Sequence, residues 1–130
     1  MEGVSTTGVL VLLLLLQVKH WLFDGPMQTK RMVMEKGRYG QPAGLIHSGL
    51  QGVGSIACLA IVGAGGIASL ALGLADAAVH YHVDYAKQQI VMSRRWSYDD
   101  SFFWWAMTFD QMLHQITYIA IAAAVSVWAM

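Results

Sequence analysis

Residues 4–24 read VSTTGVLVLLLLLQVKHWLFD, an apolar run that ends on a histidine and an aspartate. A helix needs about 20 mostly apolar residues to cross the hydrocarbon core of a bilayer, and this stretch is long enough. A secretory signal peptide would start with basic residues and end at a small-residue cleavage site. No Lys or Arg precedes Lys19, and no Ala-x-Ala motif follows. We therefore predict a retained transmembrane helix, with a cleaved signal peptide as the alternative.

The composition of the whole chain also favours a membrane protein. Of 130 residues, 56% are hydrophobic and 12% are charged, whereas soluble domains carry roughly 25% charged residues. Eight basic residues balance eight acidic ones, so the basic excess of a nucleic-acid-binding protein is missing and we expect no nucleic-acid partner. A single cysteine, Cys58, excludes an internal disulfide and a multi-cysteine zinc cluster. The length suits one integral-membrane domain, residues 1–130.

Three more apolar segments follow, separated by polar or glycine-rich connections. Pro42 suits the first position of the second helix, and small residues in the third segment allow close helix packing. Gly49, Gly52 and Gly54 are predicted to be further close-packing positions. We predict an all-α membrane protein, a small bundle of four transmembrane helices at about residues 4–24, 42–62, 67–87 and 102–128.

The basic residues predict how the bundle is oriented. Apart from Lys19, all of them lie in the first connection, 25–41, or in the segment 87–101 around the third connection. In a four-span protein these two connections are on the same side of the membrane, and loops rich in Lys and Arg stay in the cytoplasm. We therefore expect both connections in the cytoplasm and both termini in the periplasm.

Ionisable side chains interrupt all four predicted spans. Charged groups inside a bilayer are costly and are usually functional. Three His/Asp pairs have a spacing of four residues, which places both members on one helix face, and the second span contains one more histidine. All lie near the cytoplasmic ends of their spans and can converge at one level. The candidate metal ligands are His20, Asp24, His47, His80, Asp84, Asp110 and His114.

Imidazole and carboxylate groups together suit Zn, Mn or Fe, and four-helix bundles hold such metals on inward-facing side chains. Seven candidates exceed the four ligands of one tetrahedral zinc ion. Either two ions are bound, or some candidates hold the ligands in place. We therefore expect a site for one or two divalent metal ions near the cytoplasmic face, with Asp76, one turn before His80, as a supporting residue.

A polar network without a metal is the alternative. Polar contacts between membrane helices contribute about 0.6 kcal/mol each on average. Burying one aspartate costs about 2.5–3.5 kcal/mol on insertion scales. Hydrogen bonds alone therefore do not offset the burial of three carboxylates, whereas a divalent cation or ion pairing could.

Several motifs occur in order along nearly the whole chain. The segment HWLFDGPMQT at 20–29 is followed by MEKG at 34–37 and by LIH at 45–47. HYHVDYAK follows at 80–87 and FDQMLH at 109–114. These motifs resemble those of the bacterial and phage membrane-protein family called domain of unknown function 3307. One departure is Gly25-Pro26 after Asp24, where the family usually keeps apolar residues, so the first helix is expected to end earlier here.

The resemblance implies a polytopic fold in a bacterial inner membrane. It adds Gln28, Lys87 and Gln111 as candidate supporting residues through the family's His-x-x-x-Asp-x-x-x-Gln, His-x-x-x-Asp-x-x-Lys and Asp-Gln-x-x-His motifs. The family has no established activity, so the resemblance implies no reaction.

Three functions therefore stay open. A metal-dependent hydrolase would activate water at the membrane interface and act on membrane lipids, with Arg94, Arg95, Lys30 and Arg31 available to an anionic head group. A structural or accessory subunit of a larger membrane complex would use the His/Asp cluster to hold the bundle together. An ion or proton transporter would need a homo-oligomer, because four helices are few for one pathway.

Overall fold

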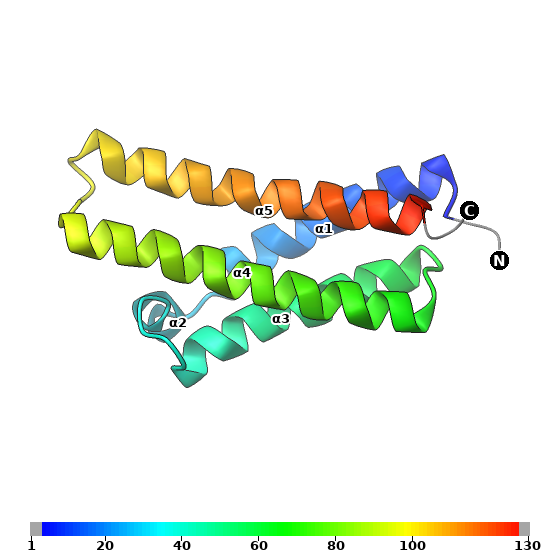
Figure 1. Cartoon of the computed structure of the whole chain (residues 1–130), viewed down its shortest axis with the longest axis horizontal. Coiled ribbons are helices and arrows are strands. Elements are labelled where there is room, and N and C mark those ends of the chain that lie inside the picture. Colours follow the sequence, from blue (N-terminus) through cyan, green and yellow to red (C-terminus); the bar gives the residue numbers. More distant parts are fainter. Residues whose placement is uncertain (1–3, 128–130) are drawn as a thin grey trace.

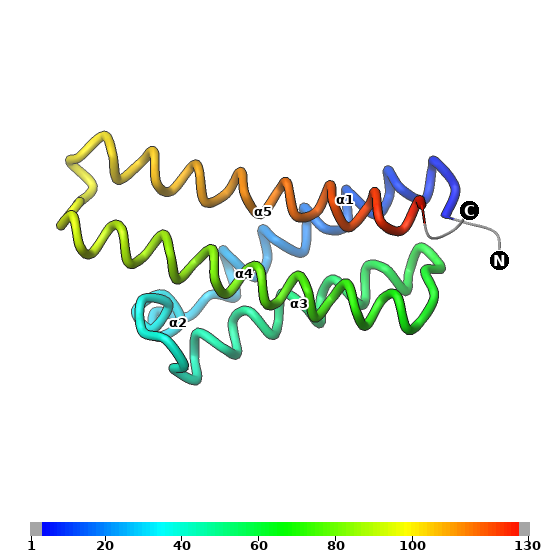
Figure 2. The backbone as a smooth tube through the Cα atoms, in the orientation of Figure 1, coloured from blue at the N-terminus to red at the C-terminus, as the bar shows by residue number. Residues whose placement is uncertain are grey.

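Largely apolar runs, separated by polar or glycine-rich connections, fold into four long helices, and the first connection contains one short helix. The computed structural model describes residues 4–127, and no strand occurs among them. The helices are α1 (Thr6–Asp24), α2 (Lys30–Glu35), α3 (Pro42–Ile61), α4 (Gly66–Arg94) and α5 (Ser101–Val127). The four long helices form an elongated bundle, and α2 lies at one end of it (Figure 1). The start of α1 and the end of α5 lie at the other end (Figure 2).

Local sequence signals explain where the helices begin and end. The Ser5 side chain accepts a hydrogen bond from the backbone N–H of Gly8 and so caps α1. α1 ends at Asp24, directly before Gly25-Pro26. Pro42 opens α3, where its missing N–H costs nothing. α4 ends where Arg95 adopts a left-handed backbone conformation, with φ of 54°.

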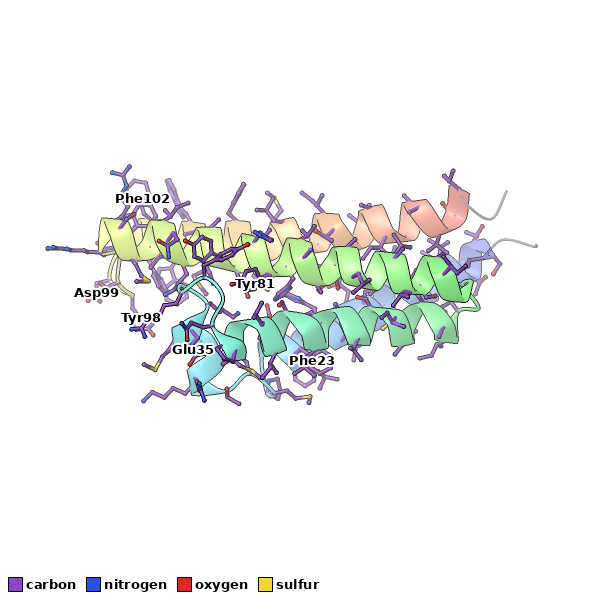
Figure 3. All side chains as sticks on the ribbon, turned by 60° about the horizontal axis from the view of Figure 1, so that its bottom comes forward. Phe23, Glu35, Tyr81, Tyr98, Asp99 and Phe102 are labelled. Carbon is purple, nitrogen blue, oxygen red and sulfur yellow. The ribbon has the colours of Figure 1, made fainter. Side chains whose placement is uncertain are left out.

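One boundary differs clearly from the prediction. α4 continues to Arg94, whereas we expected the third span to end near residue 87 and a polar loop to follow. Residues 88–94 are polar in part but contain neither glycine nor proline, so nothing in them interrupts the helix. The connection to α5 is short; Figure 3 labels Tyr98 and Asp99 in it and Phe102 in the first turn of α5. The last residue of the fourth predicted span, 128, lies outside the described residues.

Within the described residues, α1 and α3 are long and apolar enough to cross a membrane. A core helix of a soluble protein or a signal sequence meets the same criteria, and α1 lies near the N-terminus. α4 and α5 have the length but not the apolar composition, because ionisable and amide side chains interrupt them. Two of the four predicted spans are therefore supported by length and composition.

Glycines set the closest approaches between helices. A Cβ atom at Gly52 of α3 would lie only 2.6 Å from the carbonyl oxygen of Gly73 in α4. A Cβ atom at Gly54 would lie 2.6 Å from Cγ of Lys19 in α1. Both confirm the predicted close packing. Gly49 was predicted to be a close-packing position as well. A Cβ atom built at Gly49 would have no side chain or neighbouring helix within 4 Å, so this prediction was wrong.

The interior of the bundle is apolar toward one end and polar toward the other. The apolar core joins α1, α3 and α5 and consists of Leu12, Leu16, Cys58, Leu59, Tyr118, Ile121, Ala122 and Val125. Nearer the end where α2 lies, the buried side chains are mostly ionisable. This polar half contains the candidate site.

A candidate metal centre

Six of the seven predicted metal ligands come together inside the bundle. α1 supplies one at its last residue, α3 one near its start, and α4 and α5 two each, one helical turn apart. Five of the six side chains are buried, and the sixth, Asp24, is 11% exposed. The six residues are Asp24, His47, His80, Asp84, Asp110 and His114. The predicted convergence of polar residues from four helices is therefore present in the fold.

A first group of four ligands consists of Asp24, His47, His80 and Asp84. The Nε2 atoms of the two histidines lie 3.0 Å apart. Each Nε2 lies 2.9 to 3.4 Å from Asp24 Oδ1 and from Asp84 Oδ2. Ligand atoms about 2.0–2.1 Å from a tetrahedral zinc ion would be roughly 3.4 Å apart. The first group therefore fits the chemistry and the spacing of a four-ligand metal site.

The Nδ1 atoms of these two imidazole rings lack the hydrogen bonds that metal-bound histidines usually make. The Nδ1 atoms of His47 and His80 are buried and have no hydrogen-bond partner among the described residues. Metal-bound histidines commonly donate this N–H to a carbonyl or a carboxylate, which fixes the orientation of the ring. Here packing orients the rings instead, since the His80 ring stacks on that of His114 with centroids 4.1 Å apart.

A second group of three ligands consists of Asp84, Asp110 and His114. His114 Nε2 lies 3.3 Å from Asp110 Oδ1 and 3.6 Å from Asp84 Oδ1. These three atoms are buried and none makes a hydrogen bond to a described residue. Buried polar groups normally have a partner, so these atoms are suited to hold a cation. Three protein ligands would also leave one position open, as in catalytic zinc sites.

Asp84 belongs to both groups and uses a different oxygen for each. Its Oδ2 faces His47 and His80, and its Oδ1 faces His114. A carboxylate placed in this way could bridge two cations. This arrangement fits the two-ion form of the predicted site.

Two lysines enter the cluster and balance part of its negative charge. Lys36, which follows α2, places Nζ 2.8 Å from Asp84 Oδ2. Lys87 places Nζ 3.4 Å from Asp110 Oδ2. Lys87 therefore pairs with a carboxylate of α5, although Asp84 lies one turn before it on its own helix. Three carboxylates thus face two ammonium groups, which leaves one negative charge when the histidines are neutral.

His20, the seventh predicted ligand, lies beside the cluster but outside both groups. Its Nδ1 lies 2.8 Å from the Tyr118 hydroxyl and its Nε2 lies 2.7 Å from Oε1 of Gln111. Lys19 Nζ donates to the Tyr118 hydroxyl, so that hydroxyl has its own hydrogen free to donate to His20 Nδ1. His20 then carries its hydrogen on Nε2 and donates it to Gln111, with Asp24 Oδ2 3.4 Å away. Its geometry is that of a residue that orients Asp24.

The predicted supporting residues fall in three places. Gln111 also donates to Asp110 Oδ2, so it links His20 to a ligand of the second group. Gln28 donates to the backbone carbonyl of Asp24 and caps the end of α1. Asp76 lies away from the two groups, where it pairs with Lys19 at 2.9 Å and accepts a hydrogen bond from Ser55.

Sequence reasoning missed three residues of the site. Gln51 donates to Asp24 Oδ1 and follows His47 by four residues, and Tyr118 follows His114 by four. The same i to i+4 rule that grouped the His/Asp pairs would have found both. The third, Lys36, comes from a connection, and only its place in the MEKG segment pointed to it.

A pocket lies beside the cluster, and we call it the polar pocket after the charged side chains in its lining. It has a volume of about 320 Å³ and is lined by Asp24, Lys36, Lys87 and Asp110 together with side chains of the α4–α5 end, among them Tyr98 and Trp104. Its lining comes from the end of α1, from α2 and the residue after it, and from the facing ends of α4 and α5, and Tyr98 is labelled in Figure 3. The candidate site is therefore buried but has an opening beside it.

Comparison with known proteins yields one match. No curated protein and no solved structure matches the chain. The sequence profile described as "Protein of unknown function (DUF3307)" matches residues 9–130, which is nearly the whole chain. This confirms the resemblance seen in the motifs, and the chain belongs to the DUF3307 family.

Proposed function

We propose that this protein is a metal-dependent hydrolase that binds two divalent cations inside a membrane-embedded helix bundle, near the cytoplasmic face. The observation that carries the proposal is Asp84, whose two oxygens face two separate groups of potential ligands. Asp24, His47 and His80 would complete the first site, and Asp110 and His114 the second. Zn²⁺, Mn²⁺ and Fe²⁺ suit this mixture of imidazole and carboxylate ligands.

Burial of charge supports a metal over a purely structural network. Removing a carboxylate from water is costly unless a cation compensates it. Lys36 and Lys87 compensate two of the three carboxylates, while Asp84 Oδ1, Asp110 Oδ1 and His114 Nε2 still lack hydrogen bonds. The cluster keeps one net negative charge, and these unpaired atoms favour the binding of a cation there.

The distribution of apolar side chains supports a membrane location for all four long helices. Buried side chains among the described residues include thirteen polar or charged ones and eleven hydrophobic ones. Large apolar side chains instead point outward on every long helix, for example Leu14, Val53, Leu74 and Ile119, each at least 60% exposed. Exposed apolar area on this scale needs a partner, and a bilayer provides one for all four helices.

The chemistry would combine cations with fixed protein groups. Divalent cations would polarise the carbonyl or phosphoryl bond whose carbon or phosphorus is attacked, and would lower the pKa of bound water. The chain itself would orient the ligands through Gln51 and His20 on Asp24 and through Gln111 on Asp110. Lys36 and Lys87 would place positive charge beside an anionic substrate in the polar pocket.

Metal content tests this proposal directly. We expect wild-type protein loaded with Zn²⁺ or Mn²⁺ in lipid nanodiscs to hold two ions per chain in elemental analysis. His80→Ala removes a ligand of the first group only, and Asp110→Ala one of the second group only, so each variant should lose one ion. Asp84→Asn should weaken both sites. The exposed histidine variant His82→Ala is the matched control and should keep both ions.

Folding is checked by circular dichroism and size exclusion for each variant. Folded wild-type protein that takes up neither metal would refute the proposal. For the hydrolase activity, metal-loaded protein should cleave bis-p-nitrophenyl phosphate or a p-nitrophenyl acyl ester, and chelation should abolish this cleavage. If two ions bind but neither probe is hydrolysed, the proposed metal site is supported and the proposed hydrolase activity is refuted.

An accessory subunit with an ion-paired polar network is the second candidate. The contact that favours it is the ion pair between Lys36 and Asp84 at 2.8 Å, because this amine already occupies one side of the shared carboxylate. In that case the variants Asp84→Asn and Lys36→Met would each destabilise the bundle. Neither the wild type nor these variants would bind metal.

A further inference from the structure

An apolar groove of about 520 Å³ runs between α4 and α5 on the outer side of the bundle. Small side chains on the two helices create it, because Ala86 and Ala106 leave space that larger residues would fill. Its apolar lining includes Val79, Val83, Ala86, Ala106, Phe109 and Leu113.

Two charged residues in this lining connect the groove to the candidate site. Lys87 and Asp110, whose Nζ and Oδ2 atoms lie 3.4 Å apart, line the groove and also the polar pocket of about 320 Å³. The two side chains therefore lie between the groove, whose surface is almost wholly apolar, and the polar pocket inside the bundle. Asp110 is in addition a ligand of the second metal group.

We propose that the groove and the polar pocket together bind one membrane lipid with an anionic phosphate head group. One acyl chain lies in the groove, and the phosphate lies in the polar pocket, at Lys87 and Lys36. The proposal rests on the proposed function, since it names the substrate class of that site as a phospholipid that enters sideways from the bilayer.

Charge complementarity selects a phosphate head group. The side chains of Lys36 and Lys87 are only 7% and 10% exposed, so each amine needs an anionic partner. When Asp84 and Asp110 hold cations, their carboxylates pair less strongly with these amines. Two buried ammonium groups beside divalent cations then suit a phosphate monoester or diester.

The groove and the polar pocket lie side by side, and this arrangement favours a lipid over a protein helix as the occupant. An apolar helix packed along α4 and α5 could fill the groove but would bring no polar group to Lys87 and Asp110. A phospholipid supplies an apolar chain and an anionic head in one molecule, and a membrane-facing groove is directly accessible to it.

Photocrosslinking in nanodiscs tests the proposal. The probe is phosphatidic acid with a diazirine in one acyl chain, at low mole fraction in phosphatidylcholine. We expect crosslinks concentrated in the peptides that contain residues 79–90 and 106–113. Ala86→Phe fills the groove and should lower this crosslinking by about tenfold, the factor that corresponds to about 1.4 kcal/mol. Ala75→Phe, at an exposed alanine of α4 outside the groove, should leave it unchanged.

The head group is tested with a second probe, diacylglycerol carrying the same diazirine but no phosphate. Phosphatidic acid should crosslink better than diacylglycerol in the wild type, and Lys87→Gln should remove most of this preference. Crosslinks spread evenly over all four long helices, or unchanged in Ala86→Phe, would overturn the proposal. Protein–protein crosslinks through the groove would show that a second copy covers it and would overturn it too.

Metal analysis of the same samples separates the two proposals. Groove-specific crosslinking in wild-type protein that binds no metal would reject the hydrolase and leave the lipid site. Two bound ions without groove-specific crosslinking would reject the lipid site and leave the proposed metal-dependent hydrolase.

Discussion

Asp84 is the single residue that the two groups of candidate metal ligands share. It is buried on α4, and its two oxygens face histidines from different groups while Lys36 approaches one of them. A neutral amide at this position would keep the size of the side chain but lose the charge that both groups share. Weaker binding at both sites in Asp84→Asn is therefore the sharpest single-residue test of a bridged site.

Tyr118 carries a second prediction at this scale. Its hydroxyl accepts a hydrogen bond from Lys19 and donates one to His20 Nδ1, so Tyr118→Phe removes an acceptor and a donor at once. A buried amine that loses a partner costs about 1–3 kcal/mol, and we expect the free energy of unfolding to fall by that amount. Detergent-induced unfolding measures it.

The ring of His20 should respond as well. In wild-type protein, ring-¹⁵N NMR should show His20 with its hydrogen on Nε2, a signal assigned by its absence in His20→Gln. Tyr118→Phe should shift this tautomer equilibrium, whereas Tyr39→Phe, which loses only a hydrogen bond to exposed His82, should not. An unchanged His20 signal in Tyr118→Phe would contradict the chain of hydrogen bonds described above.

At the scale of helices, the contact between α3 and α4 brings His47 close to His80. Gly52 and Gly73 allow this approach because neither has a side chain, and each Cβ would lie within 2.8 Å of the other residue's carbonyl oxygen. Small residues at helix contacts are typical of membrane bundles. The geometry of the candidate metal site therefore depends on a packing contact that contains no candidate ligand.

Gly52→Ala and Gly49→Ala form a matched pair on α3. The first substitution pushes a methyl group into the α4 backbone, and we expect it to lower the free energy of unfolding by about 1–3 kcal/mol and to weaken metal binding. The second adds a methyl group to open space, and its better helix propensity should be neutral or stabilising by up to about 1 kcal/mol. Equal stability of both variants would contradict close packing at Gly52.

For the whole molecule, the charges outside the bundle interior are distributed unevenly. Basic residues gather in the connections at the end where α2 lies, whereas the turn between α3 and α4 has none. If the protein spans the bilayer, this places the metal groups toward the cytoplasm.

Cysteine accessibility tests that topology in a Cys58→Ser background. Gly65→Cys, in the turn between α3 and α4, should react with a membrane-impermeant maleimide in intact spheroplasts. Ser97→Cys, in the connection between α4 and α5, should react only after lysis. Both positions are exposed in the fold, so protection reflects the membrane. Reaction at both sites before lysis would exclude the predicted orientation.

The sequence by itself determined the all-helical class, the family and six of the residues that converge. These features depend on local properties: apolar runs of helical length, glycine and proline at the ends, and spacing of four along one helix. The His/Asp pairs on α4 and α5 are predictable because a helix fixes the relation between residues one turn apart.

Only the tertiary structure decided which helices bring their pairs together and which residues stay outside. Asp76 shares a helix face with His80, yet it pairs with Lys19, whose long side chain reaches it across the interior from α1, a helix that packs on α3 and α5. Lys36 reaches Asp84 from a connection, and Asp84 lies between two groups, because both depend on how separate segments pack. Contacts between distant segments have no fixed spacing along the chain, so no local pattern could predict them.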